Sequence, residues 1–230
     1  MTPKAMILAA GLGQRMRPLT DNLPKPMLAA GGKPLLQYHL EALANAGVNE
    51  VIINLAYLGE KIRAFVGSGE SFGLSVKYSE EPEPLETAGA LLNALHLLGD
   101  EPFLLINGDV WTDYPLGTLA TRDLDADTLA HLVLVPNPEF HPAGDFSPNP
   151  SGRLEDNPQL EKYTFAGISL IHPRLIRDYP NKRVKFPLGE VLRAGIAQSQ
   201  ISAEIYRGKW SDVGTPERLA LLDSELKNNN

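Results

Sequence analysis

The stretch that decides the fold is Ala5-Met-Ile-Leu-Ala-Ala-Gly-Leu-Gly-Gln-Arg-Met-Arg-Pro-Leu-Thr20, with Pro24-Lys25-Pro26 just after it. Its apolar run, Met6 to Ala10, is typical of a buried strand and breaks into the glycine turn Gly11-Leu12-Gly13. Two arginines and a lysine follow. Bare backbone N–H groups beside cations bind phosphate well, so this turn is a candidate phosphate loop. The other interpretation is a surface turn with solvated cations.

Two standard phosphate loops fit this turn poorly. The dinucleotide-binding fingerprint needs a third glycine where the chain has Met16, and no clear ribose-binding acid follows the second expected strand. The loop of P-loop NTPases ends in Gly-Lys-Ser/Thr, which Gly32-Lys33-Pro34 does not supply. An NAD-dependent oxidoreductase is therefore disfavoured.

The composition is that of an ordinary globular protein. The 230 residues are 43% apolar and 21% charged, enough for a substantial core, and the net charge is −7. This acidic balance argues against nucleic acid or an anionic membrane as a partner. The absence of cysteine excludes disulfides and thiolate zinc sites. The first apolar run is too short for a signal peptide or a membrane span, so we expect a cytoplasmic protein. A monomer or a small homo-oligomer is expected.

Short apolar runs alternate with helical patterns along most of the chain. This alternation indicates βαβ units, and hence an α/β, Rossmann-like, doubly wound sheet that is mainly parallel, with helices on both faces. No hexapeptide β-helix repeat is found, so residues 1–230 are expected to form a single domain. Strands are expected at 6–10, 51–53, 74–78, 103–106, 131–135, 163–171 and 201–206, and helices at 34–43, 61–66, 88–98 and 188–197, with a last helix capped by Thr215 and Pro216.

Residues 136–160 break this pattern. Prolines recur there among asparagine, glycine and aspartate, and no periodicity survives. We expect an irregular excursion over one edge or face of the sheet, of a length that is often functional.

Three further motifs contain polar residues that could serve a site. Asp109 in Asn107-Gly108-Asp109 follows an apolar strand, whose carboxyl end faces the crevice where such sheets bind ligands, although Asn-Gly-Asp also suits an ordinary turn. Asp212 lies in Trp210-Ser-Asp-Val-Gly-Thr-Pro216, about 100 residues later, and a packing contact before the capped helix is its alternative. In Glu81-Pro-Glu-Pro-Leu-Glu-Thr-Ala-Gly89, acids precede a helix, where its dipole favours them in any case.

These motifs together resemble the signatures of sugar-phosphate nucleotidylyltransferases, over residues 4 to about 217. That family carries Leu-Ala-Ala-Gly-x-Gly-x-Arg-Met, Pro-Leu-Thr and Pro-Lys-Pro near its start, Pro-Leu-(Glu/Gly)-Thr-(Ala/Gly)-Gly in the middle, and Trp-x-Asp-(Val/Ile)-Gly-Thr-Pro near its end. The resemblance implies that a nucleotidyl group passes from a nucleoside triphosphate to a sugar 1-phosphate, that pyrophosphate leaves, and that Mg²⁺ is the cofactor.

The resemblance also implies roles for single residues. Lys25 would bind the α-phosphate and Arg15 the leaving pyrophosphate, which suits a point charge and a forked guanidinium respectively. Asp109 and Asp212 would hold one Mg²⁺, an ion that takes one or two carboxylates together with phosphate oxygens and water. The remaining nucleotide contacts would come from Ala10, Gly11, Leu12, Gly13, Glu81, Glu86, Thr87, Gly89, Asn107 and Gly108.

The sugar side rests on a weaker resemblance. His141-Pro-Ala-Gly-Asp-Phe146 is similar to strings of the short members that join UTP to N-acetylmuramate 1-phosphate in cell-wall recycling, although Ala88 replaces a glycine of that subgroup. Asp145, Glu161 and Gly167 are expected to border the sugar, and polar loop groups satisfied by water are the alternative. UTP with N-acetylmuramate 1-phosphate is favoured over GTP with mannose 1-phosphate and over a glucose-1-phosphate enzyme. A non-catalytic nucleotide-sugar sensor is the remote alternative.

Overall fold

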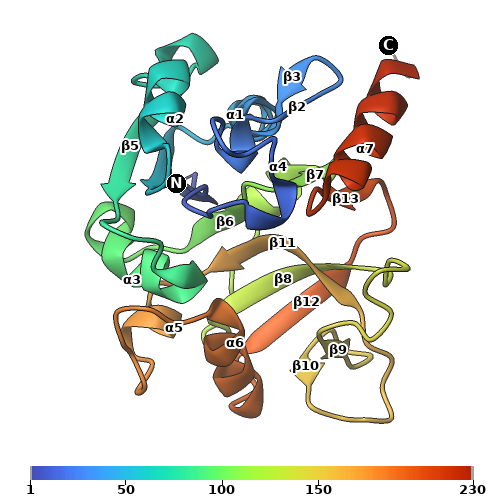
Figure 1. The fold of residues 1–230 in the computed structure, drawn as a ribbon. Coiled ribbons are helices and arrows are strands. Elements are labelled where there is room, and N and C mark those ends of the chain that lie inside the picture. Colours follow the sequence, from blue (N-terminus) through green and yellow to red (C-terminus); the bar gives the residue numbers. More distant parts are fainter. Residues whose placement is uncertain (1, 229–230) are drawn as a thin grey trace.

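The computed structural model of the chain describes residues 2–228, in which helices pack on both faces of one central sheet (Figure 1). The sheet contains β1 (Ala5–Leu8), β4 (Glu50–Leu55), β5 (Ser75–Glu80), β6 (Phe103–Asn107), β8 (Ala130–Val135), β11 (Thr164–Ile171) and β12 (Ile201–Ile205). The α-helices are α1 (Leu35–Asn45), α2 (Gly59–Val66), α3 (Glu86–Leu98), α4 (Leu116–Ala120), α5 (Arg174–Arg177), α6 (Leu188–Ala197) and α7 (Pro216–Asn228). Short strands pair outside the sheet: β2 (Ala29–Ala30) with β3 (Lys33–Pro34), β7 (Val110–Thr112) with β13 (Trp210–Asp212), and β9 (Ser147–Pro148) with β10 (Leu154–Glu155).

The strand order of the sheet is β12-β8-β11-β6-β1-β4-β5. Strand β11 runs antiparallel to both of its neighbours, and all other neighbouring strands are parallel. The prediction of a mainly parallel, mixed sheet is therefore confirmed. Central strands of this kind are buried on both faces, which is why β1 and β6 are continuous apolar runs without alternation.

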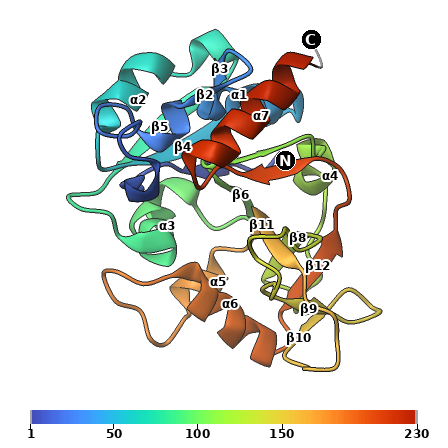
Figure 2. The same ribbon diagram turned by 45° about the vertical axis from the view of Figure 1, so that its right-hand side comes forward.

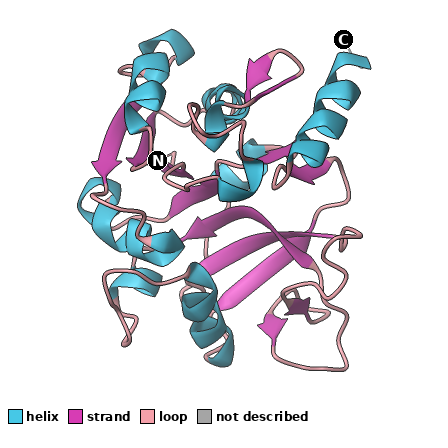
Figure 3. Ribbon diagram, viewed as in Figure 1, coloured by secondary structure: helices cyan, strands magenta, loops and turns pink. Residues whose placement is uncertain are grey.

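Two layers of helices cover the sheet (Figure 3). Helices α3, α5 and α6 pack on one face through residues such as Leu91, Ile176 and Leu192. Helices α1, α2 and α4 pack on the other face, where Leu40 and Ile62 are fully buried. None of the helices within residues 2–228 combines the length and the apolar character needed to cross a bilayer.

The last helix, α7, packs beside the short strands β2 and β3 from the first part of the chain (Figure 2). Its first turn is capped as predicted, because the Thr215 hydroxyl accepts the Arg218 N–H at 3.4 Å and Pro216 opens the helix. Further along, Asp223 Oδ1 accepts the N–H of Gly31 in the β2–β3 turn at 2.9 Å. Helix α7 thus holds the ribbon β7–β13 against the loop that follows β1.

The irregular excursion at 136–160 is also confirmed. It contains only the two-residue strands β9 and β10 and a series of turns. Single bridges tie it to the sheet region, from Phe146 to Tyr163 and from Arg153 to Ser202.

Candidate active site

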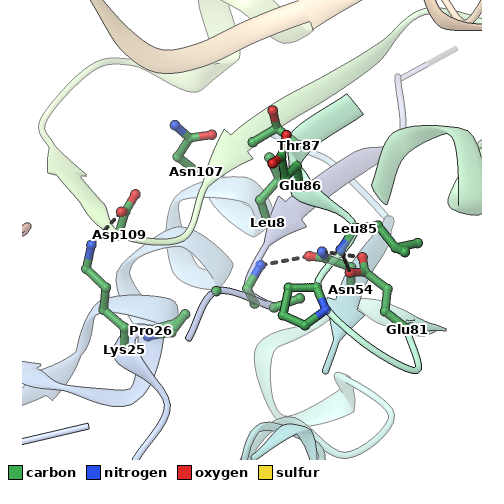
Figure 4. Close-up of a pocket in the computed structure, with 14 residues that line it drawn as sticks. Leu8, Lys25, Pro26, Asn54, Glu81, Leu85, Glu86, Thr87, Asn107 and Asp109 are labelled. Carbon is green, nitrogen blue, oxygen red and sulfur yellow. Dashed lines mark hydrogen bonds and ion pairs between the residues drawn. The ribbon is translucent and has the colours of Figure 1, made fainter. Parts of the chain in front are cut away.

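A cleft of about 210 Å³ opens where β1, β4 and β6 end (Figure 4). Carboxyl ends of parallel strands meet at one edge of such a sheet, which is where this class of fold binds ligands. The cleft brings together the turn after β1, Lys25, the segment before α3 and the end of β6, which lie far apart in the sequence. It is lined by Leu8, Ala9, Ala10, Gly11, Lys25, Pro26, Asn54, Glu81, Pro84, Leu85, Glu86, Thr87, Asn107 and Asp109.

The glycine turn reaches this cleft at Gly11, while Leu12, Gly13 and Arg15 lie outside its lining. Among residues 2–228, no acceptor pairs with the N–H groups of Gly11, Leu12 and Gly13. Gly13 has a φ of 61°, and a side chain there would meet Thr20 Cγ2 at 2.9 Å, so the turn requires glycine. Arg15 follows in an exposed position with no partner in the described part of the chain. The turn therefore offers free donors and a free cation.

Lys25 forms an ion pair with Asp109, the first predicted metal ligand. Its Nζ is 2.5 Å from Asp109 Oδ2, and only 11% of the lysine side chain is exposed. The lysine starts a 3-10 turn (Lys25–Met27) behind Pro24, which fixes its backbone. The cation and the carboxylate thus share one side of the cleft.

The ribbon β7–β13 brings the second aspartate next to the first. Asp212 is paired with Val110 across the ribbon, and the Val213 N–H donates to the Asp109 carbonyl at 2.9 Å. Arg218 of α7 contacts Asp212, with Nη1 3.2 Å from Oδ2. Two aspartates more than a hundred positions apart therefore lie close together, Asp109 in the turn just before β7 and Asp212 at the end of β13, each beside a cation.

A buried histidine supports this ribbon from behind. His39 of α1 is 5% exposed, and its ring lies beside the Val110 backbone next to Asp109, while its Nε2 has no hydrogen-bond partner among residues 2–228. Burial lowers its pKa to about 4, so the ring is neutral near pH 7. Sequence patterns gave no indication of this contact, because His39 occupies an ordinary core position of an amphipathic helix.

The donor set fits a magnesium ion. Asp212, at the end of β13, and Asp109, directly before its partner strand β7, supply hard carboxylate oxygens. No group of three or more histidine, cysteine, aspartate or glutamate side chains that could hold a metal occurs within residues 2–228. The remaining ligands must then be water and substrate oxygens, which is how Mg²⁺ is usually bound beside phosphates.

A row of buried, hydrogen-bonded polar groups forms the floor of the cleft, and of its two side chains, Asn54 and Glu81, the sequence predicted only Glu81 as a site residue. Asn54 Oδ1 accepts the Ala9 N–H at 2.7 Å, and its Nδ2 donates to Glu81 Oε1 at 2.7 Å. The second carboxylate oxygen of Glu81 accepts the Leu85 N–H at 3.0 Å. Burial raises the Glu81 pKa against these two hydrogen bonds. Asn54 was missed, although an asparagine inside the apolar strand 50–55 was a visible signal.

The predicted base-binding segment has backbone partners of its own. The N–H groups of Ala88 and Gly89 both point to the Phe186 carbonyl, at 3.0 and 3.2 Å. A side chain at Gly89 would meet the Val184 carbonyl at 2.5 Å, so glycine is needed here for packing. Glu86 and Thr87 do line the cleft, and the Thr87 hydroxyl accepts the N–H of Leu188 at 2.7 Å. A nucleotide contact by Gly89 stays a prediction.

Two further predicted glycines also have a packing reason. Gly108 donates its N–H to the Leu8 carbonyl at 2.9 Å, and a side chain there would approach that oxygen to 2.6 Å. Gly167 has a φ of 74° at an irregularity of β11, and a side chain there would meet Asn107 Nδ2 at 2.7 Å. Asn107 therefore occupies the space beside Gly167 and faces the cleft from the end of β6.

The other sugar-side residues lie outside the cleft lining. Asp145 accepts the Phe165 N–H at 2.8 Å and lies 3.0 Å from His141 Nε2. Glu161 accepts the Tyr163 hydroxyl at 2.6 Å. Both carboxylates are exposed; Asp145 ties the excursion to β11, whereas Glu161 makes a local contact just before that strand, and contact of either with a sugar remains a prediction.

Comparison with known proteins gives a consistent result. The sequence profile of the nucleotidyl transferase family matches residues 4–229. An N-acetylmuramate alpha-1-phosphate uridylyltransferase of Neisseria meningitidis serogroup B is 45% identical over 94% of this chain and 95% of its own length. A mannose-1-phosphate guanyltransferase of Hypocrea jecorina is 31% identical over 93% of this chain and 61% of its own length.

One solved structure confirms the fold. A putative glucose-1-phosphate thymidylyltransferase of Bacillus anthracis, crystallised with sucrose, superposes with a TM-score of 0.85 at 21% identity, over 99% of this chain and 96% of its own. At that identity the likeness concerns the fold alone.

Proposed function

The chain belongs to the nucleotidyl transferase family, and on that premise we propose that it joins UTP to N-acetylmuramate 1-phosphate, forming UDP-N-acetylmuramate and pyrophosphate. Transfer of a nucleotidyl group to a sugar 1-phosphate is the activity of its named relatives. The Neisseria uridylyltransferase carries the choice of base and sugar, because it matches over nearly all of both chains at 45% identity. The guanyltransferase match is weaker and covers 61% of that protein.

The chemistry needs no nucleophile from the protein. A phosphate monoester is already an anion near pH 7, so an oxygen of the sugar phosphate attacks the α-phosphorus of UTP, and the bond to the β-phosphate oxygen breaks. The protein must place two anions in line and offset their repulsion. Mg²⁺, held by Asp109 and Asp212, would supply charge neutralisation between the acceptor phosphate and the α-phosphate.

Residues of the cleft, and residues of the turn next to it, would divide this task. The free N–H groups of Gly11, Leu12 and Gly13 would donate to the triphosphate, as glycine turns after buried strands do. Lys25, almost buried beside Asp109, would turn its charge to the α-phosphate. Arg15 is exposed and unpaired, so it would reach the departing pyrophosphate without breaking another contact.

We place the reaction in the cytoplasm, within cell-wall recycling.

The test is a matrix of four nucleoside triphosphates against the 1-phosphates of N-acetylmuramate, mannose and glucose, read by pyrophosphate release. UTP with N-acetylmuramate 1-phosphate should be the best pair. An equal mixture of UTP and GTP should yield a uridine product in large excess, because a polar pocket discriminates strongly when the wrong base leaves buried groups unpaired. An excess of guanosine product would reject this assignment.

A further inference from the structure

Arg218 forms a contact that the proposed reaction leaves without a role. Its Nη1 lies 3.2 Å from Asp212 Oδ2, and the two side chains are only 16% and 29% exposed. Lys25 stands in the same relation to Asp109 at 2.5 Å. Each of the two carboxylates that would hold the metal is therefore already paired with a cation of the chain.

The position of Arg218 is fixed by three neighbours. The Phe140 ring lies against the guanidinium, with its centroid 3.9 Å from Cζ, a distance at which cation–π attraction is favourable. A side chain at position 214 would meet Arg218 Nη2 at 2.1 Å, so Gly214 leaves the space that the guanidinium fills. The hydroxyl of Thr215 accepts the backbone N–H of Arg218. These contacts hold the guanidinium on Asp212.

We propose that Arg218 is the counter-ion of Asp212 and keeps the protein's affinity for a divalent cation low until a triphosphate arrives. A metal ion entering alone must share a carboxylate with a cation a few ångströms away, and this repulsion weakens its binding. A metal that enters with a triphosphate brings several negative charges, which offset that repulsion. The guanidinium then has donors free to turn to phosphate, since only one of its nitrogens contacts Asp212.

Phe140 extends this coupling to the excursion at 136–160. The ring is 52% exposed, and its cation–π contact is with the arginine that pairs with Asp212. Loss of the aromatic ring should loosen Arg218 and shift metal affinity in the same direction as loss of the arginine, by less.

The test titrates the whole protein with Mn²⁺, a spectroscopic substitute for Mg²⁺, and measures free Mn²⁺ by electron paramagnetic resonance without any substrate. Arg218→Gln should bind Mn²⁺ about fivefold more tightly than the wild type, a factor expected when a partly exposed ion pair competes for the site. Arg218→Lys keeps the charge and should stay within about twofold. Lys227→Gln removes the same charge from α7, at the Asp223 pair far from the ribbon, and should change nothing.

Phe140→Leu gives a second measurement if Arg218→Gln folds poorly, and it should bind Mn²⁺ more tightly than the wild type by a smaller factor. Adding a non-hydrolysable UTP analogue should remove the advantage of Arg218→Gln. Equal or weaker Mn²⁺ binding by folded Arg218→Gln, or no binding by either protein, would overturn the proposal. The inference rests on the proposed reaction only through the metal, and the titration without the analogue contains no nucleotide or sugar phosphate, so its outcome is independent of the turnover matrix.

Discussion

Replacing Asn54 by alanine should damage the cleft from below, since its side chain joins three elements. The amide accepts the Ala9 N–H at the end of β1 and donates to Glu81, which in turn accepts the Leu85 N–H before α3. Asn54, Ala9 and Glu81 are 3%, 2% and 6% exposed, so water does not replace the lost partners without rearrangement. The truncation leaves one buried N–H and one carboxylate oxygen unpaired.

The expected cost follows from those two groups. A buried polar group without its partner costs roughly 1–3 kcal/mol, so Asn54→Ala should lower the free energy of unfolding by about 3 kcal/mol. Urea denaturation followed by circular dichroism measures it. Asn93→Ala is the matched control, because Asn93 also donates to two oxygens, at 3.0 and 3.1 Å, but from an exposed position. It should cost less than about 1 kcal/mol.

The pH dependence gives this prediction a second arm. Burial raises the pKa of Glu81, and the hydrogen bond from Asn54 partly offsets this effect. Asn54→Ala removes that bond, so the pKa of Glu81 should be higher in the variant than in the wild type. A carboxyl group with a raised pKa adds stability below its unfolded value and loses that contribution as pH rises through the folded value. The deficit of Asn54→Ala should therefore grow from pH 4.5 towards pH 8. A deficit under about 1 kcal/mol at every pH would refute the reasoning about the buried chain.

Other changes test single contacts. Arg15→Ala should impair use of the triphosphate and pyrophosphorolysis together, measured by initial rates in both directions; a change confined to the sugar-phosphate KM would place Arg15 elsewhere. Gly89→Ala should lower the free energy of unfolding by about 1–3 kcal/mol, and with it the urea midpoint, because the added methyl group meets the Val184 carbonyl. An unchanged midpoint would disprove the packing role. The His131 ring and two further neighbours lower the pKa of Glu204 to about 2, so its contribution to stability is present above pH 4.5 and lost as pH falls towards 2. Glu204→Gln should thus be less stable than the wild type at pH 7, and that gap should narrow below pH 4.5; a constant gap in urea unfolding would contradict this.

The sequence predicted what local pattern encodes. Apolar runs placed the central strands, and strand ends placed Asp109 and the glycine turn at the cleft. The cap at Thr215 was visible because capping is a local interaction. The α/β class followed from the alternation of these elements.

What the sequence did not reveal depends on contacts between distant segments. The ribbon β7–β13 has three residues in each strand and pairs positions a hundred apart, so no periodicity announces it. The hydrogen bonds of Asn54 and the ring contact of Phe140 with Arg218 exist only once the sheet has brought their elements together. Glycines at 89, 108 and 167 were assigned to ligand binding, whereas the structure gives each a steric reason within the fold.

Turnover of the double variant Asp109→Asn/Asp212→Asn, compared with both single variants, tests most directly whether these carboxylates act as one metal site. Each single change should lower turnover about a hundredfold without unfolding the protein, the order expected when a charge-stabilising group is lost. Because both residues would hold the same ion, the double variant should fall no more than about threefold below the weaker single variant. Near-normal turnover in either single variant, or a combined loss of about ten-thousandfold, the product of two independent effects, would contradict a shared site.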